Sequence, residues 1–457
     1  MTAAPGLTTG LSTKEATAAG PATGPAGALL DLVTDLRWAD VPAHVRRHVD
    51  TLTTDLAAVC RAGVDAPATA IAARVARATM PGEDAVLLGT GERCSVLGAA
   101  FANAVLANVL DQDDGHPLVK GHPGAVVVPA ALAVGQLVDA TPDRLAAAIL
   151  VGYEVGIAAA VRQHERWPLY HGSGSWGAVA AASAAASLLG LDRRTVSHAW
   201  GLAEYHGPVA LVMRSVAQPA MTKDGIGWGA HAGVAAALLA AEGFTATPSQ
   251  LEQDPVPASA RTEPWQVLRT YLKPWPCCRW AQPGIAAALE VATQAGPLRA
   301  DDVESLEITT FAAAAELQAT PPADTEQAQY NVVWPVLWAL LTGDYPVAAA
   351  LGGFDDPALR SLAGRTTVRT DEVLTAQFPA RRRTRVEVRL RDGRTLAAGP
   401  VTSPGDPGDP GWAGVAQRKA AAAWGDAPPP RPVAGAGLAA LDADALLGVL
   451  HHPVAPA

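Results

Sequence analysis

The chain of 457 residues has few residues of the kinds that mark several protein classes. It has four cysteines, too few for a disulfide framework in so long a chain, and none of them has the CxxC spacing of a zinc ribbon. Acidic residues outnumber basic ones, 44 to 34, and the net charge is −10. We therefore expect a reducing, cytoplasmic location, and we expect neither nucleic acid nor an anionic membrane as a partner, since both require a cationic surface.

We also expect no segment for targeting or membrane insertion. The N-terminus has no basic stretch followed by an apolar one, so no secretory signal is visible. The longest apolar run, 145–161, is interrupted by Glu154 and is shorter than the ~20 residues of a membrane helix. We interpret it as a buried helix.

Lysine is scarce, with five residues among 34 basic ones: Lys14, Lys120, Lys223, Lys273 and Lys419. A genome that favours arginine codons explains the bias. Each remaining lysine then becomes a candidate for a position that needs a compact ammonium group, because a guanidinium cannot replace it there.

The hydrophobic pattern divides the chain into four parts, of which the first two are as follows. Residues 1–24 are Ala, Gly, Thr and Pro with almost no large apolar side chain, which predicts disorder. From 25 to 268 the pattern is helical, and the helices are so apolar that they must lie inside a large bundle. The expected helices include 43–61, 95–110, 124–138, 143–162, 174–189 and 224–242.

Near residue 270 the pattern changes. Segments 302–310 and 385–390 alternate between apolar and polar residues, and Asp392-Gly393 predicts a hairpin turn into 395–398. We expect a smaller α+β unit over 269–404, followed in 405–457 by helical segments near 413–424 and 437–450. The predicted fold class is mainly α, with a large helical bundle and this smaller unit.

A loop between two predicted helices carries three carboxylates and two imidazoles within twelve residues: Asp111, Asp113, Asp114, His116 and His122. Three interpretations stay open: a metal site, a loop held by turn chemistry alone, and a metal-free His–Asp catalytic arrangement. Because Pro123 suits the first position of a helix, His122 is expected at its N-cap, where free N–H groups favour anions.

Three further segments combine reactive side chains with a predicted helix start. They are His171-Gly-Ser-Gly, Met221-Thr-Lys223-Asp with Thr222 as the expected N-cap, and Tyr271-Leu-Lys273-Pro-Trp-Pro-Cys-Cys278-Arg279. Taken singly, each is explained by ordinary helix capping or by a proline-rich hinge. Together they would gather positive charge at one spot of an acidic protein, as a small substrate with carboxylates requires.

These motifs resemble the signature of the MmgE/PrpD family. The matching segments are 100–114, 122–129, Gly152-Tyr-Glu-Val, His171 with its glycines, Leu189-Gly-Leu-Asp192, Met221-Thr-Lys223 and Lys273-Pro-Trp-Pro-Cys. The family includes 2-methylcitrate dehydratase, cis-aconitate decarboxylase and iminodisuccinate epimerase. The resemblance implies a helical domain made from both chain ends, an inserted α+β lid, a homodimer, and a site between domain and lid that needs no metal or cofactor.

Carried over by position, the resemblance assigns catalytic roles to Asp111, His122, His171, Lys223 and Lys273. We also expect Asp113, His116, Gly115, Cys278, Arg279 and Trp334 at the substrate. The last set includes three departures from the decarboxylase-like pattern: Gly115 replaces a hydroxyl residue, Cys278 a histidine and Trp334 a tyrosine. We therefore expect a less polar pocket at these points, where Arg279 compensates as a carboxylate clamp.

The preferred function is a cofactor-free lyase that acts on a small carboxylated metabolite by proton transfer alpha to a carboxylate or carbonyl. His122 is the candidate base, oriented by Asp111 or Asp113, and His171 the candidate acid. Lys223 and Lys273 would bind carboxylate and stabilise an enolate-like intermediate. Dehydration is preferred, with epimerisation and decarboxylation as alternatives on the same scaffold.

Two other classes remain open at this point. One is a metal-assisted hydrolase or hydratase that uses Asp113, Asp114, His116 and His122. The other is a non-catalytic protein that binds a carboxylate.

Overall fold

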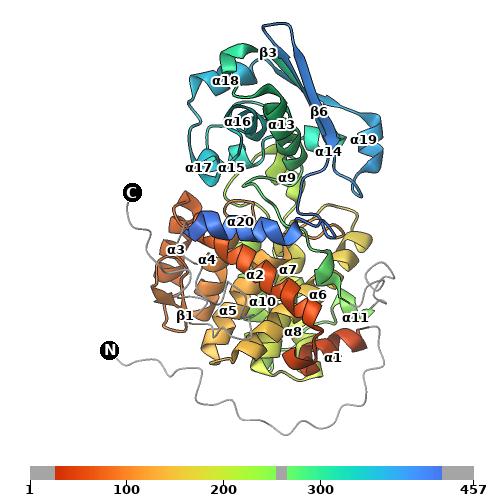
Figure 1. Cartoon of the computed structure of the whole chain (residues 1–457). Helices are drawn as coiled ribbons and strands as arrows, with labels where there is room; N and C mark the ends of the chain where they lie inside the picture. The colour runs from red at the N-terminus through yellow and green to blue at the C-terminus, as the bar shows by residue number, and fades with distance from the viewer. Residues whose placement is uncertain (1–25, 254–264, 425–457) are drawn as a thin grey trace.

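A computed structural model describes residues 26–253 and 265–424 of the chain, and the statements below concern these residues. The disorder predicted for 1–24 and the helix predicted near 437–450 lie outside them. Within them the protein is mainly α and has two large hydrophobic cores (Figure 1). One core belongs to a helical domain, formed by α1–α8, α10 and α20. The other belongs to an α+β unit, residues 282–401, and also takes in Val216 of α9 and Trp275 and Trp280.

The helical domain is built around apolar helices that are buried on nearly every side. The predicted helices are present, and the sequence pattern gave no separate prediction for α3, α8, α9 or α11. Small residues allow close packing: a Cβ on Gly156 of α6 would lie 2.5 Å from the Cβ of Ala180 on α7. The bounds are α1 Gly27–Asp35, α2 Ala43–Ala62, α3 Pro67–Thr79, α4 Val96–Asn108, α5 Pro123–Leu137, α6 Pro142–Arg166, α7 Ser173–Leu189, α8 Arg193–His206, α9 Val212–Ala217, α10 Ile226–Ala241 and α11 Gln250–Gln253.

Helix α6 contains the run predicted to be a buried helix. It is long and apolar enough to cross a membrane by composition, but 94% of its most apolar stretch is buried inside the protein. Short elements complete this part: the 3₁₀ helices Trp38–Asp40 and Gln266–Arg269, and the strands β1 Ala85–Val86 and β2 Arg93–Cys94.

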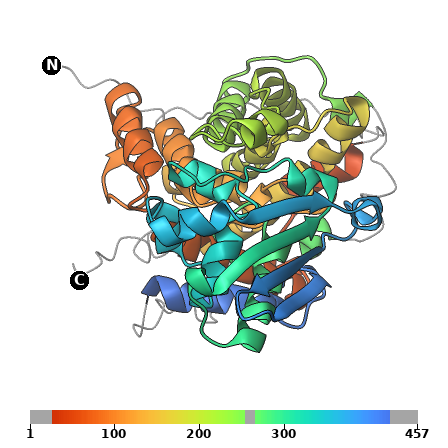
Figure 2. The ribbon, with the colours of Figure 1, turned by 90° about the horizontal axis from the view of Figure 1, so that it is seen from above.

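The α+β unit contains a four-stranded sheet in the order β4-β3-β5-β6 (Figure 2). Strands β3 (Val303–Thr310), β5 (Thr384–Leu390) and β6 (Thr395–Val401) confirm the predicted alternation and hairpin. Strand β4 (Thr366–Thr370), which pairs parallel to β3, was not predicted, because its Thr- and Arg-rich sequence is mostly exposed. The helices are α13 Gln282–Ala295, α14 Ala312–Ala315, α15 Thr325–Gln329, α16 Trp334–Thr342, α17 Val347–Leu351, α18 Pro357–Ala363, α19 Glu372–Gln377 and the 3₁₀ helix Ala300–Asp302.

Two segments connect the helical domain and the α+β unit. The outgoing segment, 270–281, and the return segment, 402–411, are joined by the Leu272 N–H, which donates to the Gly405 carbonyl (2.9 Å). Arg279 of the outgoing segment donates to Ser403 (2.8 Å) and pairs with Asp406 (2.5 Å). The chain then ends its described part in α20 (Trp412–Trp424), which lies along α2 (Figure 1). The α+β unit is thus inserted between two parts of the helical domain.

Candidate active site

A cavity of about 40 Å³ lies between the helical domain, the outgoing segment and the α+β unit. One wall comes from the loop between α4 and α5, residues 109–122 (the 109–122 loop), and from Asp224 in the turn before α10. The facing wall comes from the outgoing segment and the α+β unit. The polar residues that line the cavity as a whole are Asp111, Lys120, His122, Tyr170, Asp224, Tyr271, Cys278, Arg279, Tyr330 and Arg382.

His122 occupies the predicted N-cap position of α5, with Pro123 at the first helical position. Its Nδ1 lies 2.9 Å from Oδ2 of Asp113, which is fully buried. Its Nε2 lies 3.6 Å from Asp111 and 3.5 Å from Asp224, two residues that also line the cavity. The Asp113 contact favours the tautomer with the proton on Nδ1, which leaves Nε2 to accept a proton from the cavity.

Lys273 joins this pair as a fully buried ammonium group. Its Nζ lies 2.6 Å from Asp111 Oδ1, 3.7 Å from Asp113 Oδ1 and 3.2 Å from His122 Nδ1. The predicted grouping of Asp111, Asp113, His122 and Lys273 is therefore present in the structure, although residue 273 lies more than 150 positions from the loop.

The charges in this group stabilise one another. Burial alone would raise the pKa of Asp113, but the positive charges of His122 and Lys273 hold it well below its usual range. Burial alone would lower the pKa of His122 and of Lys273, but the neighbouring carboxylates raise both pKa values above their usual ones.

Asp224 is a cavity residue that the sequence reasoning missed. Burial raises the pKa of this carboxyl. The Ser173 hydroxyl donates to its Oδ2 (3.1 Å), and its Oδ1 has no hydrogen-bond partner among the described residues. Only its place beside Lys223 could have drawn attention to it. The predicted cap Thr222 is wrong, since α10 begins at Ile226 with Gly225 as N-cap in the left-handed conformation (φ 69°).

Lys223 lies just behind the cavity instead of lining it. Its Nζ donates to the carbonyls of Asn108 (3.0 Å) and Val109 (2.6 Å) and to the side chain of Gln329. These carbonyls end α4, so the ammonium stabilises the negative end of that helix and the beginning of the 109–122 loop. The expected direct contact of Lys223 with substrate is not supported by this position.

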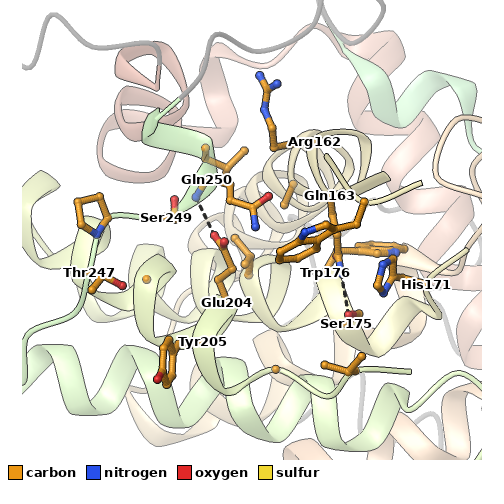
Figure 3. Close-up of a pocket in the computed structure, with 18 of the residues that line it drawn as sticks. Arg162, Gln163, His171, Ser175, Trp176, Glu204, Tyr205, Thr247, Ser249 and Gln250 are labelled. Atoms are coloured by element: carbon orange, nitrogen blue, oxygen red, sulfur yellow. Dashed lines mark hydrogen bonds between the residues drawn. The ribbon is translucent and has the colours of Figure 1, made fainter. Parts of the chain in front are cut away.

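His171 is placed away from the cavity, contrary to the predicted convergence. Its ring lines a second cavity of about 580 Å³ with Trp176 and Gln163, and neither ring nitrogen has a hydrogen-bond partner among the described residues (Figure 3). The reason is local geometry. The backbone at His171 is extended and bridges to Leu211, so successive side chains point to opposite sides, and Tyr170 faces the first cavity.

Two proposed substrate contacts are also displaced from the cavity. His116 is fully buried, its Nε2 lies 3.2 Å from the Gln266 carbonyl, and burial lowers its pKa to about 3. Trp334 is fully buried in the core of the α+β unit. Apolar packing of a large indole explains that position better than substrate contact.

Gly115 and Cys278 carry the less polar side chains that were predicted, but neighbouring residues supply polar groups to the cavity. A Cβ at Gly115 would lie 2.4 Å from the Tyr271 hydroxyl, so the phenol fills the space where a side chain at 115 would project. Cys278 lines the cavity, and burial raises the pKa of its thiol to about 12. Arg279 also lines it, with two guanidinium nitrogens held by Ser403 and Asp406. Tyr170, Tyr330 and Arg382 supply further donors.

Gly115→Ser tests the shared space with Tyr271. We expect the added side chain to displace the phenol and to lower the free energy of unfolding by about 1–3 kcal/mol, as overpacking does. Adding Tyr271→Ala should make the combined loss smaller than the sum of the two single losses. Denaturant unfolding of the three variants measures this, and strictly additive losses would contradict the proposed contact.

A metal site at this position is disfavoured by the lysine. Ligand atoms of Asp111, Asp113 and His122 lie within 4.8 Å of one another, close enough to hold an ion. The Lys273 ammonium, however, already lies against all three. The alternative set with Asp114 and His116 does not converge, because Asp114 accepts the Tyr153 hydroxyl (2.6 Å) and the Gly124 N–H (3.0 Å).

Two protein-family models and one curated protein match the chain. The model of the MmgE/PrpD N-terminal domain matches residues 27–255, and that of the MmgE/PrpD C-terminal domain matches 275–427. A curated relative from Aspergillus oryzae, the cis-aconitate decarboxylase-like protein oryM, is 27% identical over 237 residues. The match covers 47% of this chain and 46% of the relative, so the two chains correspond over about half of their lengths.

Proposed function

Because the chain belongs to the MmgE/PrpD family, we propose that it is a lyase that moves a proton on the carbon next to a carboxylate or carbonyl of a small substrate. One observation carries this proposal. An imidazole whose Nδ1 is held by a buried carboxylate directs its other nitrogen into a cavity whose facing wall carries guanidinium and phenol groups. The proposal assigns each step to side chains and calls for neither metal nor organic cofactor.

His122 is the proposed base. Its Nε2 takes the alpha proton, and Asp113 stabilises the imidazolium that forms through its contact with Nδ1. The raised pKa of His122 suits this role, because a stronger base accepts a proton more readily from carbon. Lys120, Arg279 and Arg382 would bind substrate carboxylates and stabilise the negative charge of an enolate-like intermediate.

Asp224 is the better candidate for the acid, in place of His171. Its raised pKa favours the protonated carboxyl, its Oδ2 lies 3.5 Å from His122 Nε2, and it lines the cavity. A protonated carboxyl can give its proton to carbon or to a leaving hydroxyl group. Tyr170 and Tyr330 also keep their protons, since burial raises the pKa of both phenols well above the usual value.

Dehydration is the preferred outcome of this chemistry. Epimerisation would return the proton to the other face of the same intermediate, and decarboxylation would form the intermediate by loss of carbon dioxide. The name of the Aspergillus relative favours the last of these, although the match covers under half of that protein. A non-catalytic carboxylate-binding role would use the same cations without proton transfer.

The size of the cavity supports a lid function for the α+β unit. About 40 Å³ is room for a few water molecules, since ~10–15 Å³ of such space holds one, and it is far below the ~300–1,000 Å³ of a typical ligand pocket. We propose that the α+β unit moves away from the helical domain to admit substrate and closes over it. The two connecting segments would then act as the hinge.

Deuterium exchange tests the proposed function. The protein, incubated in heavy water with a panel of di- and tricarboxylates and an excess of chelator, should introduce deuterium alpha to a carboxylate in at least one of them. Mass spectrometry detects the label whichever product follows. Binding of a panel member, seen as a thermal shift, without any exchange or product would favour the non-catalytic alternative.

We also propose that the protein is a homodimer. Helices α8 and α10 and the adjoining turn expose Tyr205 (78%), Val209 (78%) and Trp228 (53%) beside an outer groove. Such a group of exposed apolar side chains is typical of an interaction surface. We expect light scattering to give twice the mass of one chain. Trp228→Glu should give the mass of a single chain. Val373→Glu, at an exposed apolar residue of α19, is the matched control and should leave the dimer intact.

A further inference from the structure

The four lysines within the described residues all contact or belong to the 109–122 loop or the end of the helix before it. Lys120 is part of the loop, Lys223 binds the carbonyls at its beginning, and Lys273 binds the Asp111 carboxylate. The last one, Lys419, comes from α20 at the other end of the chain. Its Nζ donates to the Gln112 carbonyl (2.9 Å) and pairs with Asp55 of α2 (2.6 Å).

This loop needs external support. Asp111, Asp113 and Asp114 are buried within four residues of one another, so their charges would repel if nothing compensated them. Asp111 also has a left-handed backbone (φ 49°), a conformation that non-glycine residues adopt only when the surroundings impose it. Ammonium groups are suited to the task, since each can donate up to three hydrogen bonds to carbonyl or carboxylate oxygens.

Gln112 links Lys419 to the catalytic groups on both sides of it. Its carbonyl accepts from Lys419, and its side chain donates to the Pro274 carbonyl (2.9 Å), next to Lys273. Its chain neighbours are Asp111, which pairs with Lys273, and Asp113, which orients His122. A shift of the Gln112 backbone would therefore move both carboxylates with respect to the imidazole.

We propose that Lys419 is a positioning residue of the active site: its ammonium, held by Asp55, holds the Gln112 carbonyl and thereby sets the places of Asp111 and Asp113. It acts through other residues and does not line the cavity. The inference rests on the proposed function for its catalytic meaning, but the placement of the loop can be measured without any substrate. The competing explanation is that Lys419 only attaches α20 to α2.

The test follows the His122 ring by NMR titration of the full chain labelled at histidine Cε1, with His122→Asn to assign the signal. Lys419→Met should lower the pKa of His122 by about one pH unit, because a displaced Asp113 no longer supports the charged ring. Removal of a positive charge alone would raise that pKa. Arg418→Met, at the exposed neighbour on the same helix, is the control and should leave the titration unchanged.

The double variant Asp55→Leu/Lys419→Met separates positioning from attachment. It replaces a buried ion pair by apolar side chains, which often preserves stability, but it still lacks the bond to Gln112. We expect thermal stability near that of the unaltered chain with the His122 pKa still lowered. Recovery of both the stability and the pKa, or a raised pKa in either variant, would overturn the proposal.

Hydrogen exchange of the unaltered chain gives a second measurement that needs no variant. At low denaturant, the backbone amides of α20 and those of the 109–122 loop should exchange through the same opening, so that their exchange rates rise equally with denaturant concentration. A loop that stays protected after α20 has exchanged would overturn the proposal. If no carboxylate undergoes exchange in the deuterium assay, the proposed function fails while these two measurements still decide the role of Lys419.

Discussion

Replacing His122 by asparagine should lower the rate of alpha-proton exchange by about a thousandfold and leave the protein folded. The amide retains polarity and similar size at the N-cap of α5, but it lacks a basic nitrogen to take the proton from carbon. The rate is measured as deuterium uptake into whichever carboxylate the panel identifies, and circular dichroism checks the fold. A rate within tenfold of that of the unaltered chain would remove His122 from the role of base.

Two histidine controls accompany this variant. His44→Asn changes an exposed residue at the start of α2 and should leave the exchange rate unchanged. His171→Asn separates the family assignment from the geometry. Since the ring faces the second cavity in Figure 3, we expect a loss of less than about tenfold, well below the 10²–10⁴ typical of a lost acid or base. A loss as large as that of His122→Asn would show that the loop at 171 turns toward the substrate during the reaction.

Replacing Lys273 by methionine should have the largest effect on stability. The ammonium is fully buried and contacts two carboxylates, so its removal leaves unpaired buried charge. We expect the free energy of unfolding at pH 7 to fall by about 3–5 kcal/mol and exchange activity to be lost. Denaturant unfolding measures the first effect.

The pH dependence of that loss identifies its cause. Lys273 depresses the folded-state pKa of Asp113, so the stability it contributes is present above the unfolded carboxyl pKa of ~3.9 and is lost as pH falls through the lower folded value. The penalty of Lys273→Met should therefore stay near its pH 7 value down to about pH 5, and shrink as the pH falls through ~3.9 and below. Adding Asp111→Leu, which removes one of the unpaired charges, should recover part of the stability at pH 7. A penalty independent of pH would instead indicate lost packing.

Local patterns were enough to predict the long, strongly apolar helices of the bundle and three of the four strands of the sheet. In long apolar helices such as α6 and alternating strands such as β5, the local sequence shows which side chains are buried. This is because the period of the side chains follows from the backbone geometry. Strand β4 was missed for the same reason: it is paired but mostly exposed, so its sequence carries no alternation.

In the candidate site too, residues that are close in sequence were predicted together, whereas most of those from distant segments were not. Asp111, Asp113 and His122 belong to one loop, and their proximity in sequence predicted their proximity in space. Lys273 was found through the scarcity of lysine and the family resemblance. Tyr330, Arg382 and Asp224 were missed, because a tyrosine, arginine or aspartate in a loop or at the end of an element carries no local sign that it faces a cavity.

By itself, the sequence determined the helical bundle, the α+β unit, the family and the His–Asp loop, all of which depend on local periodicity or on contiguous motifs. Only the tertiary structure decided which side chains meet. The backbone pairing of His171 with Leu211 turns the imidazole away from the cavity and the neighbouring Tyr170 toward it. The Lys419 contact with Gln112 joins residues 307 positions apart. Such contacts depend on how distant segments pack, which no local pattern of residues encodes.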